Sequence, residues 1–461
     1  MSALLTLSLP PRTDGSRLAG LPVAIIGAGP VGLAAAAQLQ ERGIDVVIFE
    51  AGGAAGAAVS SWGHTRLFTP WEYLIDAASA RLLTRAGWQA PADLTALPLG
   101  RELVERYLVP LAATPELVGR IRFNSTVVAV SRQGMDRSRS MNRADTPFVL
   151  RVHTDVGTLD YEARAVIDGS GTHGTPNGLV ASGLDPLHAD EVRGSILPAL
   201  PDVLGADRAR FTGRHTLVVG AGHSAANTLI DLARLADDDP DTTITWAIRT
   251  ASPERVFGSE QDELAARGSL GARVQALVEL GRITLVDRFE IDDVQRSTDG
   301  RVAVVGRRLG LGSPDDRGPA PVEAGGRMRV RVDTIVVDLV VTATGFRPDL
   351  VPLREIRLSL DEIVEAPRLL APLIDPNLHS CGTVPAHGVD VLTHPEPNFY
   401  IAGMKSFGRA PTFLLATGYE QVRSIADELA GHWQAARTVA LVLPETGVCS
   451  TGGTDAGSCC A

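Results

Sequence analysis

Residues 21–50 read LPVAIIGAGPVGLAAAAQLQERGIDVVIFE, and their pattern indicates the class of fold. An apolar run ends in a glycine turn at residues 27–32, an alanine- and leucine-rich stretch follows, and a second apolar run closes at Glu50. The order predicts a strand, a turn, a helix and a second strand, which together form the unit that binds a dinucleotide. The alternative is a glycine turn that binds no ligand.

The three glycines of the turn have different roles in this prediction. Gly27 permits a tight turn, Gly29 lets the backbone approach a pyrophosphate, and Gly32 lets the helix pack closely on the strand. Pro30 stands among them, where the free amides of the helix N-terminus meet the phosphate charge. Glu50 can accept hydrogen bonds from a ribose 2′-hydroxyl and would repel a 2′-phosphate. The first ligand is therefore expected to be FAD or NAD.

Length and charge limit the class of protein. The chain of 461 residues is long enough for about two or three domains. Its formal net charge of -11, without any Lys/Arg-rich block, argues against nucleic acid or an anionic membrane as the partner. Residues 18–40 carry no charge, but their glycines and Pro30 favour a strand and a helix over a membrane span. Residues 1–20 show no secretory signal, so they are expected to be a disordered lead of a cytoplasmic protein.

The segment after the second strand, SSWGHTRLFTPWEYLID at residues 60–76, is neither a clean helix nor a clean strand. Its mixture of aromatic and polar side chains is typical of a loop near a flavin. Trp62, His64, Arg66 and Thr69 are candidates for contacts to the isoalloxazine ring or the pyrophosphate. The alternative is a structural loop in which Trp62 and Trp71 pack against the core.

A small β-meander is expected next. Residues 99–111 predict a helix, and residues 121–131 and 148–164 then alternate as strands do, around a charged tip at residues 134–146. The meander leads into AVIDGSGT at residues 165–172, a strand that enters a glycine turn at Gly171. This turn would bring the chain back beside the dinucleotide.

The second half of the sequence repeats the plan. HTLVVGAGHSAANTLIDLAR at residues 215–234 is again strand, turn and helix, with Gly220, Gly222 and Ala225 at the three turn positions. Strand-like segments follow at residues 243–249, 282–286 and 301–307, and a Pro/Gly/Asp-rich tip at residues 313–326. The strand and turn of residues 338–348, which include Gly345, match residues 165–172. This duplication predicts a second dinucleotide site, and two dinucleotides imply electron transfer between them.

The two copies differ at the residue that distinguishes cofactors. The second copy has Arg249 where the first has Glu50, which indicates NADPH because an arginine pairs with a 2′-phosphate that an acid repels. Ala225 in place of the third glycine fits the same preference. The alternative for Arg249 is a solvated charge at a strand end. Ser224 is expected to contact pyrophosphate or to cap the second helix, and His223 to line the turn.

The segment PNFYIAGMKSFGRAPTFLLATGYEQVRSIADELAG at residues 397–431 predicts a strand, a polar loop and a long helix with Pro411 near its first turn. The N-terminus of that helix would stabilise negative charge on a reduced flavin, with Gly403, Met404 and Lys405 near the cofactor. The alternative is an ordinary helix that closes the domain.

Together these patterns predict an α/β protein with two Rossmann-like dinucleotide-binding domains, each of three layers in a ββα sandwich. The FAD-binding domain is expected to be discontinuous, over residues 21–180 and 334–435, with the NADPH-binding domain, residues 181–333, inserted in it. Residues 436–461 are expected to form a flexible tail.

From Val23 to about Gly431 the chain resembles the two-dinucleotide-binding-domain flavoproteins, the superfamily of pyridine-nucleotide-disulphide reductases and FAD/NADPH monooxygenases. The segments GAGHSAANT, VVTATGFRP, HSCGTVPAHGVD and IAGMKSFGRAPTFLLATGYEQ are most similar to flavin monooxygenase-like proteins found beside arsenic-resistance genes in actinobacteria. Unlike the disulphide reductases, the chain has no C-x-x-C or C-x4-C pair, because Cys381 has no neighbouring cysteine. It also lacks a clear F-x-G-x-x-x-H-x-x-x-W-P/D motif, which argues against ketone oxygenation.

The resemblance implies an enzyme in which NADPH passes a hydride to FAD, and the reduced flavin reacts with O2 to give a C4a-peroxide that oxygenates a small molecule. The arsenic link makes an arsenical the first candidate substrate. One alternative is a reductase whose tail thiols take electrons from FAD. Another, of a different class, is a thiophilic-metalloid binding protein on a flavoprotein scaffold.

The tail VCSTGGTDAGSCCA at residues 448–461 holds Cys449, Cys459 and Cys460. Soft thiolates suit trivalent arsenic, copper(I) or zinc, so these cysteines are candidate metalloid ligands. The alternative is a disordered end whose cysteines have no function. A second candidate cluster joins Cys381 to His387 and His394, although histidines in a loop often serve packing alone. Four cysteines are too few and too clustered for a disulphide framework.

Overall fold

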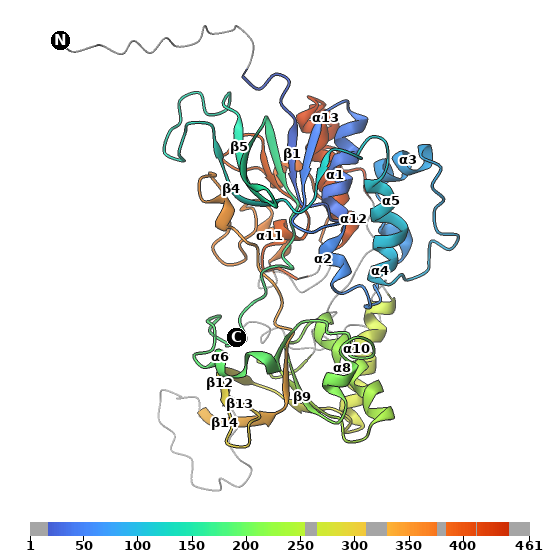
Figure 1. Ribbon diagram of the computed structural model, residues 1–461, viewed down its shortest axis with the longest axis vertical. Coiled ribbons are helices and arrows are strands. Elements are labelled where there is room, and N and C mark those ends of the chain that lie inside the picture. Colours follow the sequence, from blue (N-terminus) through green and yellow to red (C-terminus); the bar gives the residue numbers. More distant parts are fainter. Residues whose placement is uncertain (1–16, 254–264, 310–329, 376–383, 412, 442–461) are drawn as a thin grey trace, which may run out of the picture.

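The computed structural model describes residues 17–253, 265–309, 330–375, 384–411 and 413–441. It contains two α/β domains, which lie one above the other in Figure 1. Each has one five-stranded sheet and one three-stranded sheet. This confirms the predicted fold class of two Rossmann-like domains, the second inserted into a discontinuous first domain.

The sheet of the first domain is parallel throughout. Its strands run in the order β16-β7-β1-β2-β3, with bounds Phe399–Ile401, Ala165–Asp168, Val23–Ile26, Val46–Phe49 and Ile121–Arg122. The central strand β1 leads directly into the predicted glycine turn. Because the strands are parallel, all their carboxyl ends meet at the edge that carries this turn.

Successive residues of β1 pack into two different cores, one on each face of the sheet. Val23 and Ile25 join the core formed with the helices, whereas Ala24 joins the core formed with the meander. The helices on the first face are α1 (Pro30–Glu41), α3 (Ala77–Arg85) and α12 (Leu415–Leu429). The antiparallel meander consists of β4 (Thr126–Arg132), β5 (Phe148–Thr154) and β6 (Gly157–Ala163). The first domain therefore has the three predicted layers.

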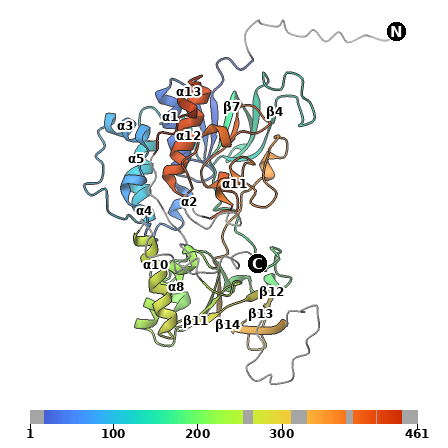
Figure 2. The same cartoon turned by 180° about the vertical axis from the view of Figure 1, so that it is seen from behind.

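The second domain has the same plan. Its parallel strands run in the order β11-β10-β9-β15-β8, with bounds Thr284–Val286, Thr243–Ala247, His215–Val219, Leu339–Thr342 and Ile196–Pro198. One face is covered by α8 (His223–Asp238) and α10 (Ala265–Glu279), which lie side by side in Figure 2. The other is covered by the antiparallel strands β12 (Phe289–Arg296), β13 (Val302–Leu309) and β14 (Val330–Val337). The duplication read from the sequence is thus present in space, strand for strand.

The boundary at which the chain leaves the second domain is later than predicted. The sequence assigned residues 334–435 to the first domain, but β15 pairs with β9 and β8 in the second sheet. Likewise, β14 pairs with β13. The chain therefore returns to the first domain only after residue 342.

The two segments that cross between the domains are paired with each other. The backbone N–H of Asn177 donates to the carbonyl of Gly345 over 3.0 Å, and that of Arg347 donates to Thr175 over 3.0 Å. Pro176 and Phe346 form an isolated antiparallel bridge between these bonds. The domains are thus joined by a short two-stranded connection.

Several short elements complete the domains. They are α2 (Ala57–Ser60), η1 (Trp71–Tyr73), α4 (Gly100–Leu103), η2 (Val104–Leu108), α5 (Val109–Ala112), α6 (Ala189–Val192), η3 (Arg193–Ser195), α7 (Arg208–Phe211), η4 (Val351–Leu353), α11 (Ala371–Ile374), η5 (Val389–Val391), η6 (Gly403–Phe407) and α13 (Trp433–Arg437). The helix predicted at residues 99–111 corresponds to α4, η2 and α5 in succession, and η2 is a π-helical turn. In the described part of the chain, every helix is too short or too polar to cross a bilayer.

Candidate functional site

The first glycine turn is in close contact with other backbone on one side and open on the other. Gly27 has a φ of 96°, and a Cβ on it would lie 3.1 Å from the carbonyl oxygen of Gly169. A Cβ on Gly32 would lie 1.9 Å from the carbonyl oxygen of Gly27, so α1 can approach the turn only with glycine there. A Cβ on Gly29, in contrast, would meet no atom within 4 Å. The backbone at Gly29 therefore faces open space that a ligand can enter.

The N-terminus of α1 has the features of an anion-binding site. Gly29 is its N-cap and Pro30 follows, so no side chain caps the helix, and its first turn contains no acidic residue. The first N–H groups of a helix lack partners within the helix and carry partial positive charge. The turn and the helix together form a site that fits a pyrophosphate.

Glu50 lies immediately after β2, beside this turn. Its Oε2 accepts a hydrogen bond from the backbone N–H of Ala28 over 2.7 Å, and its Oε1 accepts one from Gly52 over 2.8 Å. A carboxylate has about four lone-pair sites, so two remain for ribose hydroxyls. The geometry supports the predicted role of Glu50 as the ribose acceptor.

The aromatic loop that follows is held against the rest of the first domain. A Cβ on Gly100 would come within 2.9 Å of the Trp62 ring, which packs partly buried on the core. The guanidinium of Arg66 is exposed and donates to the carbonyl of Leu97. Thr69 and Trp71 are buried. These contacts favour the structural reading for much of this loop.

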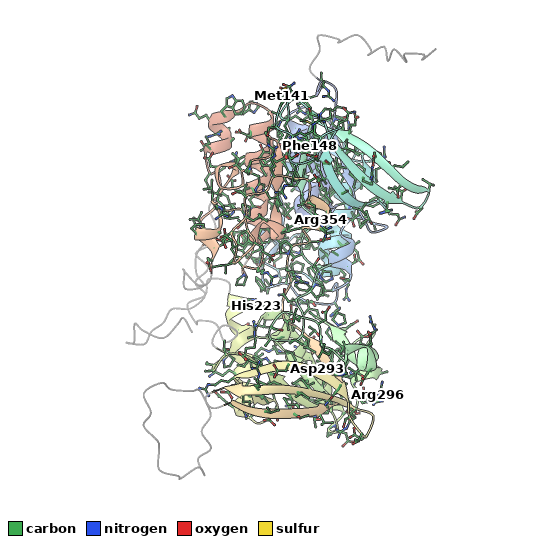
Figure 3. The ribbon with its side chains drawn as sticks, turned by 90° about the vertical axis from the view of Figure 1, so that its left-hand side faces the viewer. Met141, Phe148, His223, Asp293, Arg296 and Arg354 are labelled. Atoms are coloured by element: carbon green, nitrogen blue, oxygen red, sulfur yellow. The ribbon has the colours of Figure 1, made fainter. Side chains whose placement is uncertain are left out.

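The same loop also contacts the second domain, which the sequence did not predict. The ring of Phe68 lies 5.2 Å from that of His223, centroid to centroid, at the start of α8. Figure 3 shows His223 on the side of the second domain that faces the first. Burial raises the pKa of Asp231 in α8, and the charges of Arg234 and of His64, which belongs to the loop, oppose this rise. The loop therefore reaches the helix at which the second dinucleotide is expected.

The second glycine turn repeats the first with one change. Gly220 has a φ of 127°, and a Cβ on it would lie 2.1 Å from the carbonyl oxygen of Ala343. Gly222 is the uncapped N-cap of α8, and a Cβ on it would meet no atom within 4 Å. The carbonyl of Gly220 accepts a hydrogen bond from Nε1 of the buried Trp246 over 2.7 Å. Ala225, which replaces the third glycine, is fully buried.

The polar residues at the start of α8 are engaged within the helix. Asn227 donates from Nδ2 to the carbonyl of His223 over 3.0 Å, and Thr228 donates from its hydroxyl to the carbonyl of Ser224. His223 and Ser224 belong to the first turn of α8, where backbone N–H groups have no acceptor within the helix. Their expected contribution to binding is thus through the backbone.

Arg249 is one register position beyond the counterpart of Glu50. Pairing of Ile26 with Phe49 in the first sheet corresponds to pairing of Val219 with Ala247 in the second, which makes Ile248 the counterpart of Glu50. Arg249 follows and is exposed, and among the described residues its Nη1 contacts the carbonyl of Ala181 over 3.4 Å. Its predicted contact with a 2′-phosphate stays a prediction.

The glycine turns after β7 and β15 occupy corresponding places. Gly171 and Gly345 have φ values of 73° and 88°. Each turn follows the strand beside the central strand of its sheet, and Gly345 also accepts the hydrogen bond that joins the crossing segments. Both turns thus return the chain to the edge that carries a dinucleotide turn.

The segment η6 lies against the start of α1. A Cβ on Gly403 would come within 3.1 Å of the Val31 side chain, and one on Gly418 in α12 would come within 2.7 Å of it. The N–H of Gly403 donates to Oε1 of the buried Gln421 over 2.8 Å. Met404 packs partly buried on the same core. The N-termini of α1 and α12 therefore converge, although α12 begins at residue 415, beyond Pro411.

The candidate cysteine ligands cannot be placed, since Cys381, Cys449, Cys459 and Cys460 lie outside the described residues. Within the described residues, no group of three metal-binding side chains occurs. His387 is occupied by hydrogen bonds to the Pro385 carbonyl and Gln421. His394 accepts one from the N–H of Ser359 over 3.3 Å.

One buried ion pair at this edge was not predicted. Asp168, the last residue of β7, pairs with Lys405 of η6 over 2.6 Å. The sequence placed Lys405 near the cofactor but named no partner for it. The signal that would have found Asp168 is an acidic residue at the end of an apolar strand, directly before a glycine turn.

The chain is similar to known proteins in sequence and in fold. The family model described as pyridine nucleotide-disulphide oxidoreductase matches residues 24–306, which is more than half of the chain. Indole-3-pyruvate monooxygenase YUCCA6 of Arabidopsis thaliana is 25% identical over 267 residues, which are 58% of this chain and 55% of that protein. The match thus spans little more than half of that relative.

Two solved structures resemble nearly the whole described fold. The bacillithiol disulfide reductase of Bacillus cereus has a TM-score of 0.59 and 18% identity, over 89% of this chain and 99% of that one. The cadaverine monooxygenase of the desferrioxamine pathway from Erwinia amylovora has a TM-score of 0.60 and 14% identity, over 93% and 99%. At these identities the likeness shows a shared fold.

Proposed function

The chain belongs to the pyridine nucleotide-disulphide oxidoreductase family, and on this premise we propose that it is an NADPH-dependent flavoprotein monooxygenase acting on a small molecule. It is an enzyme that uses FAD and NADPH. When bound, FAD accepts a hydride from NADPH and delivers the electrons to O2.

The proposal is carried by the pair of open, uncapped glycine turns at corresponding places in the two domains. In the first domain, Gly27 and Gly29 would bring the backbone to the pyrophosphate of FAD, Gly32 lets α1 approach the turn, and Glu50 would accept hydrogen bonds from the adenosine ribose. In the second domain, the turn beginning at Gly220 would hold the pyrophosphate of NADPH, and an exposed arginine would pair with the 2′-phosphate of NADPH. That arginine is Arg249.

Oxygenation is favoured over disulphide reduction by the cysteine pattern. A disulphide reductase of this family would hold a pair of cysteines against the flavin, yet the sequence contains no C-x-x-C or C-x4-C pair. YUCCA6 and the cadaverine enzyme are named as monooxygenases, which supports the same reading.

The substrate class proposed is an arsenical, and the place of action the cytoplasm. This finer proposal rests on the sequence resemblance and on Cys449, Cys459 and Cys460, whose thiolates suit a thiophilic ion.

A second candidate is an NADPH-dependent reductase that works through the tail thiols. The likeness to a bacillithiol disulfide reductase and the cluster of three cysteines favour it. A third, a metalloid-binding protein without turnover, is weakened by membership of an oxidoreductase family.

Oxygen uptake with NADPH separates these candidates. Purified protein is to be screened for NADPH oxidation with and without arsenite and organoarsenicals, in air and under argon. Oxygen uptake that matches product formation supports the monooxygenase. Disulphide-dependent NADPH loss under argon supports the reductase. If neither activity is found, the metalloid-binding protein is the remaining candidate.

A further inference from the structure

The order of the strands shows over which residues the riboflavin half of a bound FAD must lie. This step rests on the proposed function. The pyrophosphate meets the turn after β1, and the adenosine ribose meets Glu50 after β2. The other half of the dinucleotide would then extend in the opposite direction from β1, toward β7 and β16, which lie on that side of β1.

The ends of β7 and β16 carry a buried ion pair. Oδ2 of Asp168 lies 2.6 Å from Nζ of Lys405, and these residues are 1% and 3% exposed. Ser170 completes the cluster: its hydroxyl donates to Oδ1 of Asp168 over 2.6 Å and accepts from Lys405 over 3.1 Å. Its backbone N–H also donates to Oδ1 over 3.1 Å.

Composition makes the lysine unusual. Of the 43 Lys and Arg residues in the chain, 42 are arginines, and Lys405 is the only lysine. A guanidinium has five donors in a rigid plane, whereas an ammonium is compact and has three donors that rotate. The buried site between β7 and η6 therefore takes the cation with the fewer donors to satisfy.

The Lys405 ammonium has three N–H donors, and two of them have acceptors among the described residues. Burial of an ion pair is stabilising only when the other donors and acceptors find partners. Asp168 accepts three hydrogen bonds, but Lys405 donates only two to the described residues. One N–H of the ammonium is left for a further acceptor. The riboflavin half of FAD carries such acceptors in its ribityl hydroxyls and ring carbonyls.

The cluster also adjoins the dinucleotide turn itself. A Cβ on Gly27 would lie 3.0 Å from the Cα of Ser170, so the residue that bridges the ion pair is in direct contact with the turn. A ligand that follows the edge from β1 toward β16 therefore passes over this cluster.

We propose that Lys405 is a cofactor-binding residue that donates its third hydrogen bond to the riboflavin half of FAD. Asp168 and Ser170 are positioning residues that hold the ammonium in place. The ammonium thereby sets a fixed positive charge beside the flavin, which favours its reduced, anionic form. The competing role is a strut that merely ties η6 to β7.

The single lysine allows a direct test on the intact, FAD-loaded protein. Lysine labelled with 15N at Nζ gives one side-chain signal in the NMR spectrum, which must come from Lys405. We expect this signal to shift when dithionite reduces the bound flavin under argon. A signal that is identical in the oxidised and reduced protein overturns the proposal. Protein that purifies without flavin would instead overturn the proposed function.

Substitutions distinguish a role of Lys405 in FAD binding from a purely structural role in holding η6 against β7. Lys405→Met is expected to weaken FAD binding about ten- to a hundredfold, the usual worth of a charge-assisted hydrogen bond, and to make the flavin harder to reduce. The double variant Lys405→Met/Asp168→Asn removes both charges, so the fold is no longer burdened by an unpaired buried carboxylate. Its FAD affinity and reduction potential are expected to remain low.

The matched control is Arg42→Met. Arg42 pairs with Asp427 over 2.7 Å and joins the C-terminal ends of α1 and α12, at the opposite end of the same layer. This variant is expected to keep the FAD affinity and the reduction potential of the unmodified protein. If the double variant at 168 and 405 does so too, Lys405 is only a strut and the proposal is wrong.

Discussion

A Cβ on Gly32 would lie 1.9 Å from the carbonyl oxygen of Gly27, so the first turn of α1 and the glycine turn before it are in contact along bare backbone. The neighbouring Gly29 is open, with no atom within 4 Å of the same position. Two glycines of one turn thus serve different purposes. The fold requires glycine at position 32, whereas position 29 faces open space, where we expect a ligand.

We predict that Gly29→Asp abolishes FAD binding while the protein still folds. The aspartate has room, but it places bulk and negative charge where the backbone must meet a pyrophosphate. The flavin content of the purified protein, measured from its visible spectrum, and its circular dichroism check this. Gly29→Ala adds bulk without charge and should lose less flavin than the aspartate variant. Normal FAD content in the aspartate variant would refute the site.

We predict that Arg249→Ala narrows the preference for NADPH over NADH, chiefly by weakening NADPH affinity. Loss of a charge-assisted contact costs roughly 1.5–3 kcal/mol, which is about ten- to a hundredfold. The measurement is KM for both nucleotides. Arg301→Ala removes another exposed arginine of the same domain, one that pairs with Asp299, and should leave the ratio unchanged. An unaltered ratio in Arg249→Ala would mean that another residue reads the phosphate.

We predict that deletion after Pro444 leaves FAD content and NADPH-driven flavin reduction intact but weakens binding or turnover of a thiophilic substrate. The cut preserves the bonds that Thr438 and Ala440 make to Arg423 and Glu420 of α12. Cys449, Cys459 and Cys460 are the clustered soft ligands of the sequence, and such thiolates suit a thiophilic ion.

Arsenite affinity and arsenite-stimulated NADPH oxidation are to be measured for the full chain, the truncation and the triple cysteine-to-serine variant. The serine variant is the control for loss of length. Identical behaviour of all three proteins would leave the cysteines without a role in this chemistry.

We predict a loss of stability in mild acid that depends on His394. Burial lowers the pKa of His394 from 6.5 to about 4. Between these values the unfolded state binds a proton that the folded state does not, so stability falls as the pH drops from about 6.5 toward 4. The full effect of this shift is about 3 kcal/mol.

Unfolding by urea at several pH values from 7 to 4 measures this effect. His394→Gln keeps a hydrogen-bonding side chain but cannot titrate, so its stability should depend less on pH. His153→Gln, at an exposed position of β5, is the control and should follow the unmodified protein. A pH profile that His394→Gln does not alter would contradict the prediction.

The fold class and the duplication could be predicted because they depend on local spacing. In each half, a few glycines at fixed distances follow an apolar strand, and this pattern is complete within about thirty residues. The sheet that strand β15 (residues 339–342) joins could not be predicted in the same way. Both domains offer a buried parallel strand as a neighbour, and only packing over the whole chain decides between them.

The candidate site shows the same division between local and distant contacts. Glu50 and the glycines could be read from the sequence, since they lie within one strand–turn–helix unit. The register that sets Arg249 one residue past the counterpart of Glu50 depends on strand pairing. Asp168 and Lys405 are 237 residues apart, so nothing in the local pattern of either residue indicates the other.

The insertion of one domain into the other also sets the order in which the protein can fold during synthesis. The first sheet lacks its edge strand β16, and α1 lacks its neighbour α12, until residues 399–429 have been made. All strands of the second domain lie between residues 196 and 342. The domain that begins later is therefore completed earlier. A nascent chain stalled near residue 390 should carry a folded second domain beside a first sheet whose β7 edge is still unpaired.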